Sequence, residues 1–155
     1  MRVTRMAAGS TALVTAALGL GLATAGTAAA AEAGSWRAYG NTNPITSSSA
    51  TWRCASTKAL AIDVGAQVCA IRSSTGASVQ AAVIVRNNRS SLYSVGAAMD
   101  LYNASGTKLG AWVCSSSGVG ANSWSVCFGR TLSHSGSVDS VGVANGVNLG
   151  LSPRV

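Results

Sequence analysis

The chain has 155 residues, and 11 Lys and Arg against 4 Asp and Glu give it a formal net charge of +7. This length allows one domain with a modest core. The basic residues are scattered singly, except for Arg86 and Arg89 in "RNNR". That scatter argues against nucleic-acid binding and favours a soluble basic surface suited to acidic partners or anionic cell walls.

Residues 1–33 have the features of a secretory signal peptide. A basic start with Arg2 and Arg5 precedes an apolar run over 13–22 and then Ala-rich cleavage sites. The run is too short to span a bilayer, and no other segment is long enough, so we expect secretion without a membrane anchor. We favour cleavage after Ala33, with "AAA" endings a few residues earlier as alternatives. Cleavage there leaves 155 − 33 = 122 residues with nine Lys or Arg against three Asp, a net charge of +6.

Residues 34–50 are polar, contain Pro44 and lack the alternation of a core strand. They predict an extended N-terminal arm that leads into a β domain over residues 51–155. Trp36, Arg37 and Tyr39 cluster at its tip, and these residue types are the most enriched among interface hot spots. Either the arm is a disordered tail, or it binds a partner by entering a cleft or by adding a strand to a sheet.

The rest of the chain reads as short alternating strands separated by Gly, Ser and Asn. We expect strands within residues 50–56, 58–73, 77–87, 91–103, 107–115, 121–129 and 137–152. In the third, Val79 to Val85 alternates so that one face is wholly apolar. Ser105–Gly106 and Asn145–Gly146 predict hairpin turns. The fold class that this pattern predicts is all-β, a single antiparallel β-sandwich of seven or more short strands.

Four cysteines in an exported chain predict two disulfides. Of three possible connectivities, we predict Cys54 with Cys69 and Cys114 with Cys127. Each pair brackets 12 to 14 residues with a turn signal, "GAQ" in the first and "SSSGVGANS" in the second. Closing a loop of that size stabilises by roughly 3 kcal/mol. There is no CxxC and only one histidine, so we expect no metal site and no cofactor.

Catalytic chemistry finds little support in the residues. The predicted mature chain has three carboxylates, and His134, Asp139 and a serine make a triad only on paper, without a GxSxG turn or an oxyanion loop. We therefore expect no catalytic residues and a non-enzymatic protein. Trp112 and Trp124 flank the second cysteine pair; either they stack on carbohydrate or, more commonly for such residues, they pack on the disulfide.

The arrangement of an Ala-rich signal, the "SWRAYGN" arm and a small basic two-disulfide β domain resembles secreted proteins of actinobacteria, and among them the adaptor subunits of umbrella toxin particles. The resemblance implies a non-enzymatic adaptor in a secreted antibacterial particle. Its arm, with Trp36, Arg37 and Tyr39, would enter the cleft of a lectin subunit with a degenerate trypsin-like fold. Its β domain would dock on a large repeat-containing toxin polypeptide.

Two other classes remain open. In the first, the protein inhibits trypsin-like proteases by placing Arg37 in their specificity pocket, although Arg37 precedes all four cysteines and has no disulfide-braced loop in the sequence. In the second, Trp112, Trp124 and the basic surface bind carbohydrate or cell wall.

Overall fold

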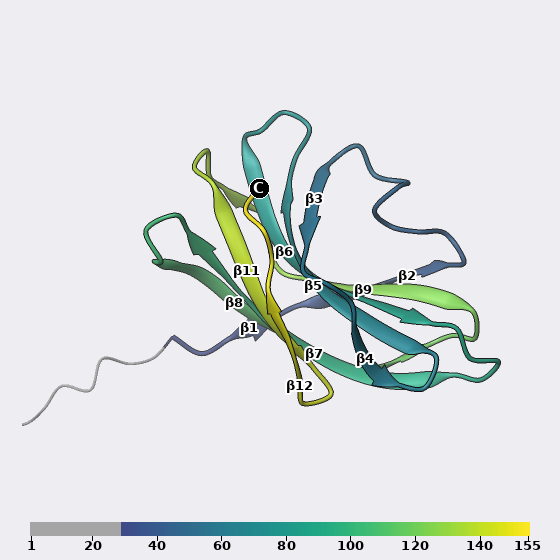
Figure 1. The fold of residues 1–155 in the computed structure, drawn as a ribbon. Coiled ribbons are helices and arrows are strands. Elements are labelled where there is room, and N and C mark those ends of the chain that lie inside the picture. The colour runs from purple at the N-terminus through teal and green to yellow at the C-terminus, as the bar shows by residue number, and fades with distance from the viewer. Residues whose placement is uncertain (1–28) are drawn as a thin grey trace, which may run out of the picture.

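A computed structural model describes residues 29–155, which form strands, turns and loops and no helix (Figure 1). Residues 1–28, most of the predicted signal peptide, lie outside the described residues. The strands are β1 (Glu32–Ala33), β2 (Ser35–Gly40), β3 (Thr51–Cys54), β4 (Lys58–Ala61), β5 (Val64–Arg72), β6 (Ser78–Asn87), β7 (Tyr93–Asn103), β8 (Lys108–Val119), β9 (Ser123–Phe128), β10 (Leu132–Ser133), β11 (Val138–Ala144) and β12 (Val147–Leu151). The predicted all-β class is confirmed.

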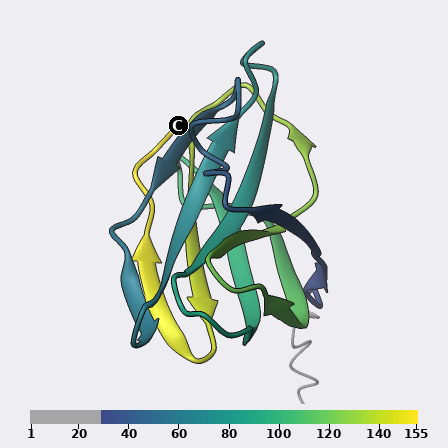
Figure 2. The same cartoon turned by 90° about the vertical axis from the view of Figure 1, so that its right-hand side faces the viewer.

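Two sheets pack face to face (Figures 1 and 2). One has the order β1-β8-β7-β11-β12, and the other has the order β2-β9-β6-β5-β3, with β10 beside β6 and β4 beside β5. The pairs are antiparallel apart from β1, which runs parallel to β8. The architecture is therefore a β-sandwich, as the short alternating segments predict.

The core lies between the two sheets because each central strand turns every second side chain inward. In β6, the predicted apolar face of Val79, Ala81, Val83 and Val85 is at most 1% exposed. Val95, Met99 and Leu101 of β7 face it from the other sheet, together with Trp112 of β8. Many of these side chains are small, so the sheets approach closely: a Cβ on Gly142 would lie 2.8 Å from Val68.

The disulfides join Cys54 to Cys69 and Cys114 to Cys127, the pairing that the spacing predicts. The first links neighbouring strands of one sheet, because Cys54 and Cys69 are partners in the β3–β5 register. The second links β8 to β9 and therefore ties one sheet to the other. The turn between Cys54 and Cys69 is at Ile62–Asp63 rather than at "GAQ", which lies within β5.

The predicted arm over 34–50 is a strand of the sandwich for part of its length. Ser35–Gly40 forms β2, paired in register with β9 from Phe128 to Trp124. Residues 41–50 then connect β2, at one edge of its sheet, to β3, at the opposite edge (Figure 1). Only Ser35–Gly40 is extended, because residues 41–50 form turns and bends, and the sandwich includes this strand rather than beginning at residue 51.

Among residues 29–155, no helix is long and apolar enough to cross a membrane.

Candidate functional site

The three residues predicted to bind a partner lie on β2 but do not share one face. Trp36 packs against the core between the sheets, and its indole N–H donates to the carbonyl of Ser115 at 2.7 Å. Arg37 is exposed and stacks its guanidinium 5.2 Å from the ring centre of Tyr39. Tyr39, two residues after Arg37, packs against the outer face of the sheet, and the register with β9 shifts between Ala38 and Gly40. Trp36 therefore anchors the strand, while Arg37 and Tyr39 remain near the surface.

Gly34 allows the chain to pass from one sheet to the other at the inter-sheet disulfide. Its N–H donates to the carbonyl of Val113 at 2.9 Å. A Cβ on Gly34 would lie 2.7 Å from the Cys114 sulfur and 2.9 Å from the Phe128 carbonyl oxygen. Only glycine fits this crossing without a shift of its neighbours, so the chain is held in place at the residue immediately before β2.

Two residues before Gly34, Glu32 also contacts the sandwich. Glu32 and Ala33 pair with Trp112 and Val113, and the carboxylate of Glu32 accepts two hydrogen bonds from Arg130 at 3.1 and 3.2 Å. The predicted cleavage after Ala33 would remove these contacts, whereas cleavage at an "AAA" ending would keep Glu32.

The outer face of the seven-stranded sheet carries a second group of aromatic and basic side chains. Trp52 of β3 meets Phe128 of β9 edge to face at 5.9 Å between ring centres. These two rings and Tyr39 pack with Ile45 of the crossing segment. One half of this face is therefore covered by the chain itself.

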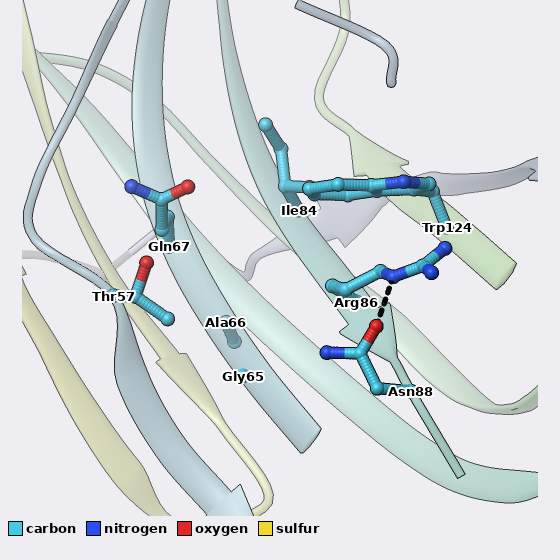
Figure 3. Close-up of a pocket in the computed structure, with 8 residues that line it drawn as sticks. All are labelled: Thr57, Gly65, Ala66, Gln67, Ile84, Arg86, Asn88 and Trp124. Atoms are coloured by element: carbon cyan, nitrogen blue, oxygen red, sulfur yellow. Dashed lines mark hydrogen bonds between the residues drawn. The ribbon is translucent and has the colours of Figure 1, made fainter. Parts of the chain in front are cut away.

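The other half of the outer face contains a hollow of about 350 Å³ (Figure 3). The strand registers build it from a row across three strands, in which Gly65 of β5 pairs with Arg86 of β6 and Arg86 pairs with Trp124 of β9. Thr57 packs over Gly65, where a Cβ would lie only 2.7 Å from the Thr57 methyl group. The lining residues are Thr57, Gly65, Ala66, Gln67, Ile84, Arg86, Asn88 and Trp124.

Arg86 is fixed by its neighbours. Its Nε donates to the side-chain oxygen of Asn88, and Nη1 donates to Asn41 Oδ1 and to the Asn122 carbonyl, both at 2.9 Å. The guanidinium also stacks 5.2 Å from the ring centre of Trp124. All of these partners are neutral, so the positive charge lies beside the hollow without a carboxylate.

The two tryptophans that flank the second cysteine pair have different environments. Trp112 is 1% exposed and belongs to the core. A Cβ on Gly110 or on Gly129 would lie within 2.6 Å of its ring, so these glycines make room for it. Trp124 is half-buried and lines the hollow. Packing accounts for Trp112, and of this pair only Trp124 offers surface to a ligand.

His134 and Asp139, which the sequence offered as members of a serine triad, form no side-chain hydrogen bond with each other in the described chain. Asp139 is 8% exposed and accepts from Nε of Arg154 at 3.0 Å. The main chain of His134 bonds to Ala77 and to Arg72. Within residues 29–155, no three His, Cys, Asp or Glu side chains gather in a metal-binding group.

Sequence reasoning missed Arg86 as a site residue. Alternation in β6 places it on the same face as Ile84, but its neighbours in the hollow come from β5 and β9, and this register is not readable from the sequence.

The sequence matches no protein-family model, and a search of curated proteins found no match. Among solved structures, the chain is similar to the alkylpurine DNA glycosylase AlkC of Pseudomonas fluorescens bound to DNA containing an abasic site analog. The identity is 13% and the TM-score 0.33, over 49% of this chain and 24% of that chain. The chain spans about a quarter of that protein's length, and the likeness carries no argument about function.

Proposed function

We propose that this protein is a secreted, non-enzymatic protein-binding module that engages its partner through the free edge of β2. The observation that carries the proposal is that β2 pairs with β9 alone and ends its sheet. An edge strand presents unpaired N–H and C=O groups to which a partner's strand can add. Arg37 and Tyr39 lie on this strand, near enough to give such pairing its register and specificity.

Export is supported by two features. The two disulfides are typical of extracellular proteins, and residues 1–33 have the basic, apolar and small-residue regions of a signal peptide. The basic surface adds attraction for an acidic partner.

The resemblance to umbrella-toxin adaptors suggests the partners, a trypsin-like lectin subunit and a repeat-containing toxin polypeptide. The structure supports a different mode of contact from a free arm. Releasing β2 would break its pairing with β9, at about 1 kcal/mol per backbone hydrogen bond, and would also free Trp36 from Ser115. We infer that the partner's cleft receives the edge of β2 while β2 stays in its sheet.

The test is affinity capture from the culture supernatant of the producing organism with tagged chains. Deleting 34–43 would remove a strand of the sandwich, so point substitutions are the sharper tool. Arg37→Ala with Tyr39→Ala removes the exposed side chains of β2 and leaves Trp36 in place. Arg53→Ala is the matched control, because Arg53 is an exposed arginine on the opposite edge strand, β3.

We expect the wild type and Arg53→Ala to capture a trypsin-like lectin and a large repeat-containing polypeptide. The double variant should lose the lectin, because removing hot-spot side chains weakens binding by roughly 30-fold or more. Capture of the same proteins by all three chains would refute the role of β2. Capture of neither protein would refute the adaptor assignment.

Protease inhibition is a second candidate, and one structural observation favours it. Arg37 is not on an unbraced tail: it pairs with Val126, next to Cys127 of the inter-sheet disulfide. An exposed arginine on a braced, extended strand suits the specificity pocket of a trypsin-like enzyme. An inhibition assay against trypsin decides this, since Arg37→Ala should abolish any inhibition and Arg53→Ala should preserve it.

A further inference from the structure

We propose that the hollow beside Arg86 and Trp124 binds a carboxylated sugar, such as a uronic acid. The hollow lies on the outer face of the sheet next to β2, since Trp124 pairs with Gly40 and Arg86 donates to Asn41, but it is not the free edge of β2, and the inference goes beyond the proposed protein-binding function. It is drawn from the shape of the hollow, the state of Arg86 and the mixture of side chains around it (Figure 3).

The hollow has the size of a small-ligand site. Its volume of about 350 Å³ lies within the roughly 300–1,000 Å³ that is usual for such sites. Six of its eight lining residues lie on β5, β6 and β9, which are held by the sheet register and by the Cys54–Cys69 disulfide nearby on β5, and Thr57 and Asn88 lie in the connections beside these strands. A site on strands of this kind is already formed before a ligand arrives, so little ordering cost falls on binding.

Arg86 gives the hollow a preference for an anion. Among residues 29–155 the salt bridges are Lys108–Asp100, Arg130–Glu32 and Arg154–Asp139, so Arg86 has no acidic partner. Its Nε and Nη1 are occupied, whereas Nη2 donates no hydrogen bond within the described chain. None of the eight lining residues is acidic. A carboxylate at Nη2 would therefore form a charge-assisted hydrogen bond with a donor that is already oriented.

Arg72 shows how a purely structural arginine differs. It donates from Nη1 to the carbonyls of Gly76 and His134, and from Nη2 to those of Gly136 and Val155. Both of its terminal nitrogens are thus occupied by the chain. Arg86 bonds to Asn41, Asn88 and Asn122 through Nε and Nη1 in the same way, but its Nη2 has no partner among the described residues.

The rest of the lining suits a sugar ring better than a simple anion. The half-buried ring of Trp124 offers an apolar surface against which the C–H face of a pyranose can pack, and the buried Ile84 lies beside it (Figure 3). Thr57 offers its hydroxyl to ring hydroxyls. Gln67 offers its Oε1 and Asn88 its Nδ2, since Gln67 Nε2 donates to the Ala55 carbonyl and Asn88 Oδ1 accepts from Arg86. A ring with hydroxyls and one carboxylate uses all of these groups at once.

The experiment is a two-dimensional amide NMR titration of the whole mature protein with glucuronate, at fixed ionic strength. Glucose, acetate and a dipeptide with a blocked N-terminus and a free C-terminal carboxylate are titrated in parallel. We expect glucuronate to shift signals of the lining residues and the Trp124 indole N–H, and to bind roughly tenfold or more tightly than glucose or acetate, because only glucuronate combines ring and charge. Equal binding of glucose, tighter binding of the dipeptide, or shifts outside the hollow would overturn the proposal.

Two variants separate ligand binding from folding. Arg86→Gln should reduce glucuronate affinity at least to that of glucose, whereas Arg53→Gln should leave it unchanged. Because Arg86 also fastens loops, Thr57→Leu provides a second route: Thr57 is exposed, and leucine there narrows the hollow while Arg86 keeps its partners. A folded Thr57→Leu protein that binds glucuronate as the wild type does would refute the site.

Discussion

Substituting Gly34 by alanine tests how firmly the N-terminal segment is built into the sandwich. A Cβ at this position would lie 2.7 Å from the Cys114 sulfur and 2.9 Å from the Phe128 carbonyl oxygen, both closer than a carbon atom can remain. Overpacking of this kind costs about 1–3 kcal/mol. For a domain of this size each kcal/mol lowers Tm by roughly 3–5 °C, so we expect Gly34→Ala to melt roughly 3–15 °C below the wild type.

Thermal unfolding followed by circular dichroism measures this shift. Gly96→Ala is the matched control, because a Cβ there meets its nearest neighbour, the Cys114 carbonyl oxygen, at an ordinary 3.6 Å. In a background where Cys114 and Cys127 are both alanine, the sulfur is gone and the cost of Gly34→Ala should fall, which a double-mutant cycle measures. Two results would contradict the close contact between Gly34 and the Cys114 sulfur. One is a Tm for Gly34→Ala equal to that of Gly96→Ala; the other is an equal loss of stability on Gly34→Ala with and without the disulfide.

Three further predictions concern other parts of the sandwich. Trp112→Ala should cost about 3–5 kcal/mol in urea unfolding; Trp112→Phe should cost much less, because the indole N–H has no hydrogen-bond acceptor among the described residues and its loss leaves no group unpaired. Equal costs would contradict this packing. The hydrogen bond from Lys108 to Asp100 raises the pKa of Lys108 above its ordinary 10.5, so its stabilising effect is complete below pH 10.5 and is lost as the pH rises through the folded-state pKa; an NMR titration should show this pKa fall in Asp100→Asn, and an unchanged pKa would contradict the contact. A chain that begins at Gly34 lacks β1, so it should be less stable than one beginning at Ala31 by about 1 kcal/mol for each backbone hydrogen bond between β1 and β8 and by up to about 1 kcal/mol for the exposed ion pair of Glu32; equal stability of the two chains would contradict this pairing.

The fold class was predictable because the central strands are regular. In β6 each second residue from Val79 is apolar and buried, and the alternation in sequence is the alternation in space. The strand predicted over 58–73 is two strands, β4 and β5, because a turn at Ile62–Asp63 interrupts it. That turn has neither Gly nor Pro at its centre; Asp63 adopts a φ of 60°, which aspartate tolerates better than most residues.

The edge strand β2 escaped prediction for a physical reason. A strand with one neighbour and a half-exposed surface does not need strict alternation, and the register shift near Tyr39 breaks the period of two. Composition located the aromatic and basic cluster of this strand but not the direction of each side chain. Trp36 turns toward the core because it pairs with Cys127 at the inter-sheet disulfide, a relation between residues 91 positions apart.

The hollow at Arg86 depends still more on tertiary structure. Its row of Gly65, Arg86 and Trp124 joins three strands, and a one-residue slip in either register would turn one of these residues to the opposite face. The disulfide pairing was accessible from the sequence because both pairs are local, and the hollow was not.

Backbone hydrogen exchange over Ser35–Gly40 tests the central claim that β2 is a strand of the sandwich with one free edge. In the isolated protein, amides directed at β9 should exchange slowly and those on the free edge quickly, and adding the captured partner should slow the second group. Fast exchange throughout this segment in the isolated protein would show that it is a free arm, and an unchanged pattern with the partner bound would show that the edge is not the binding site.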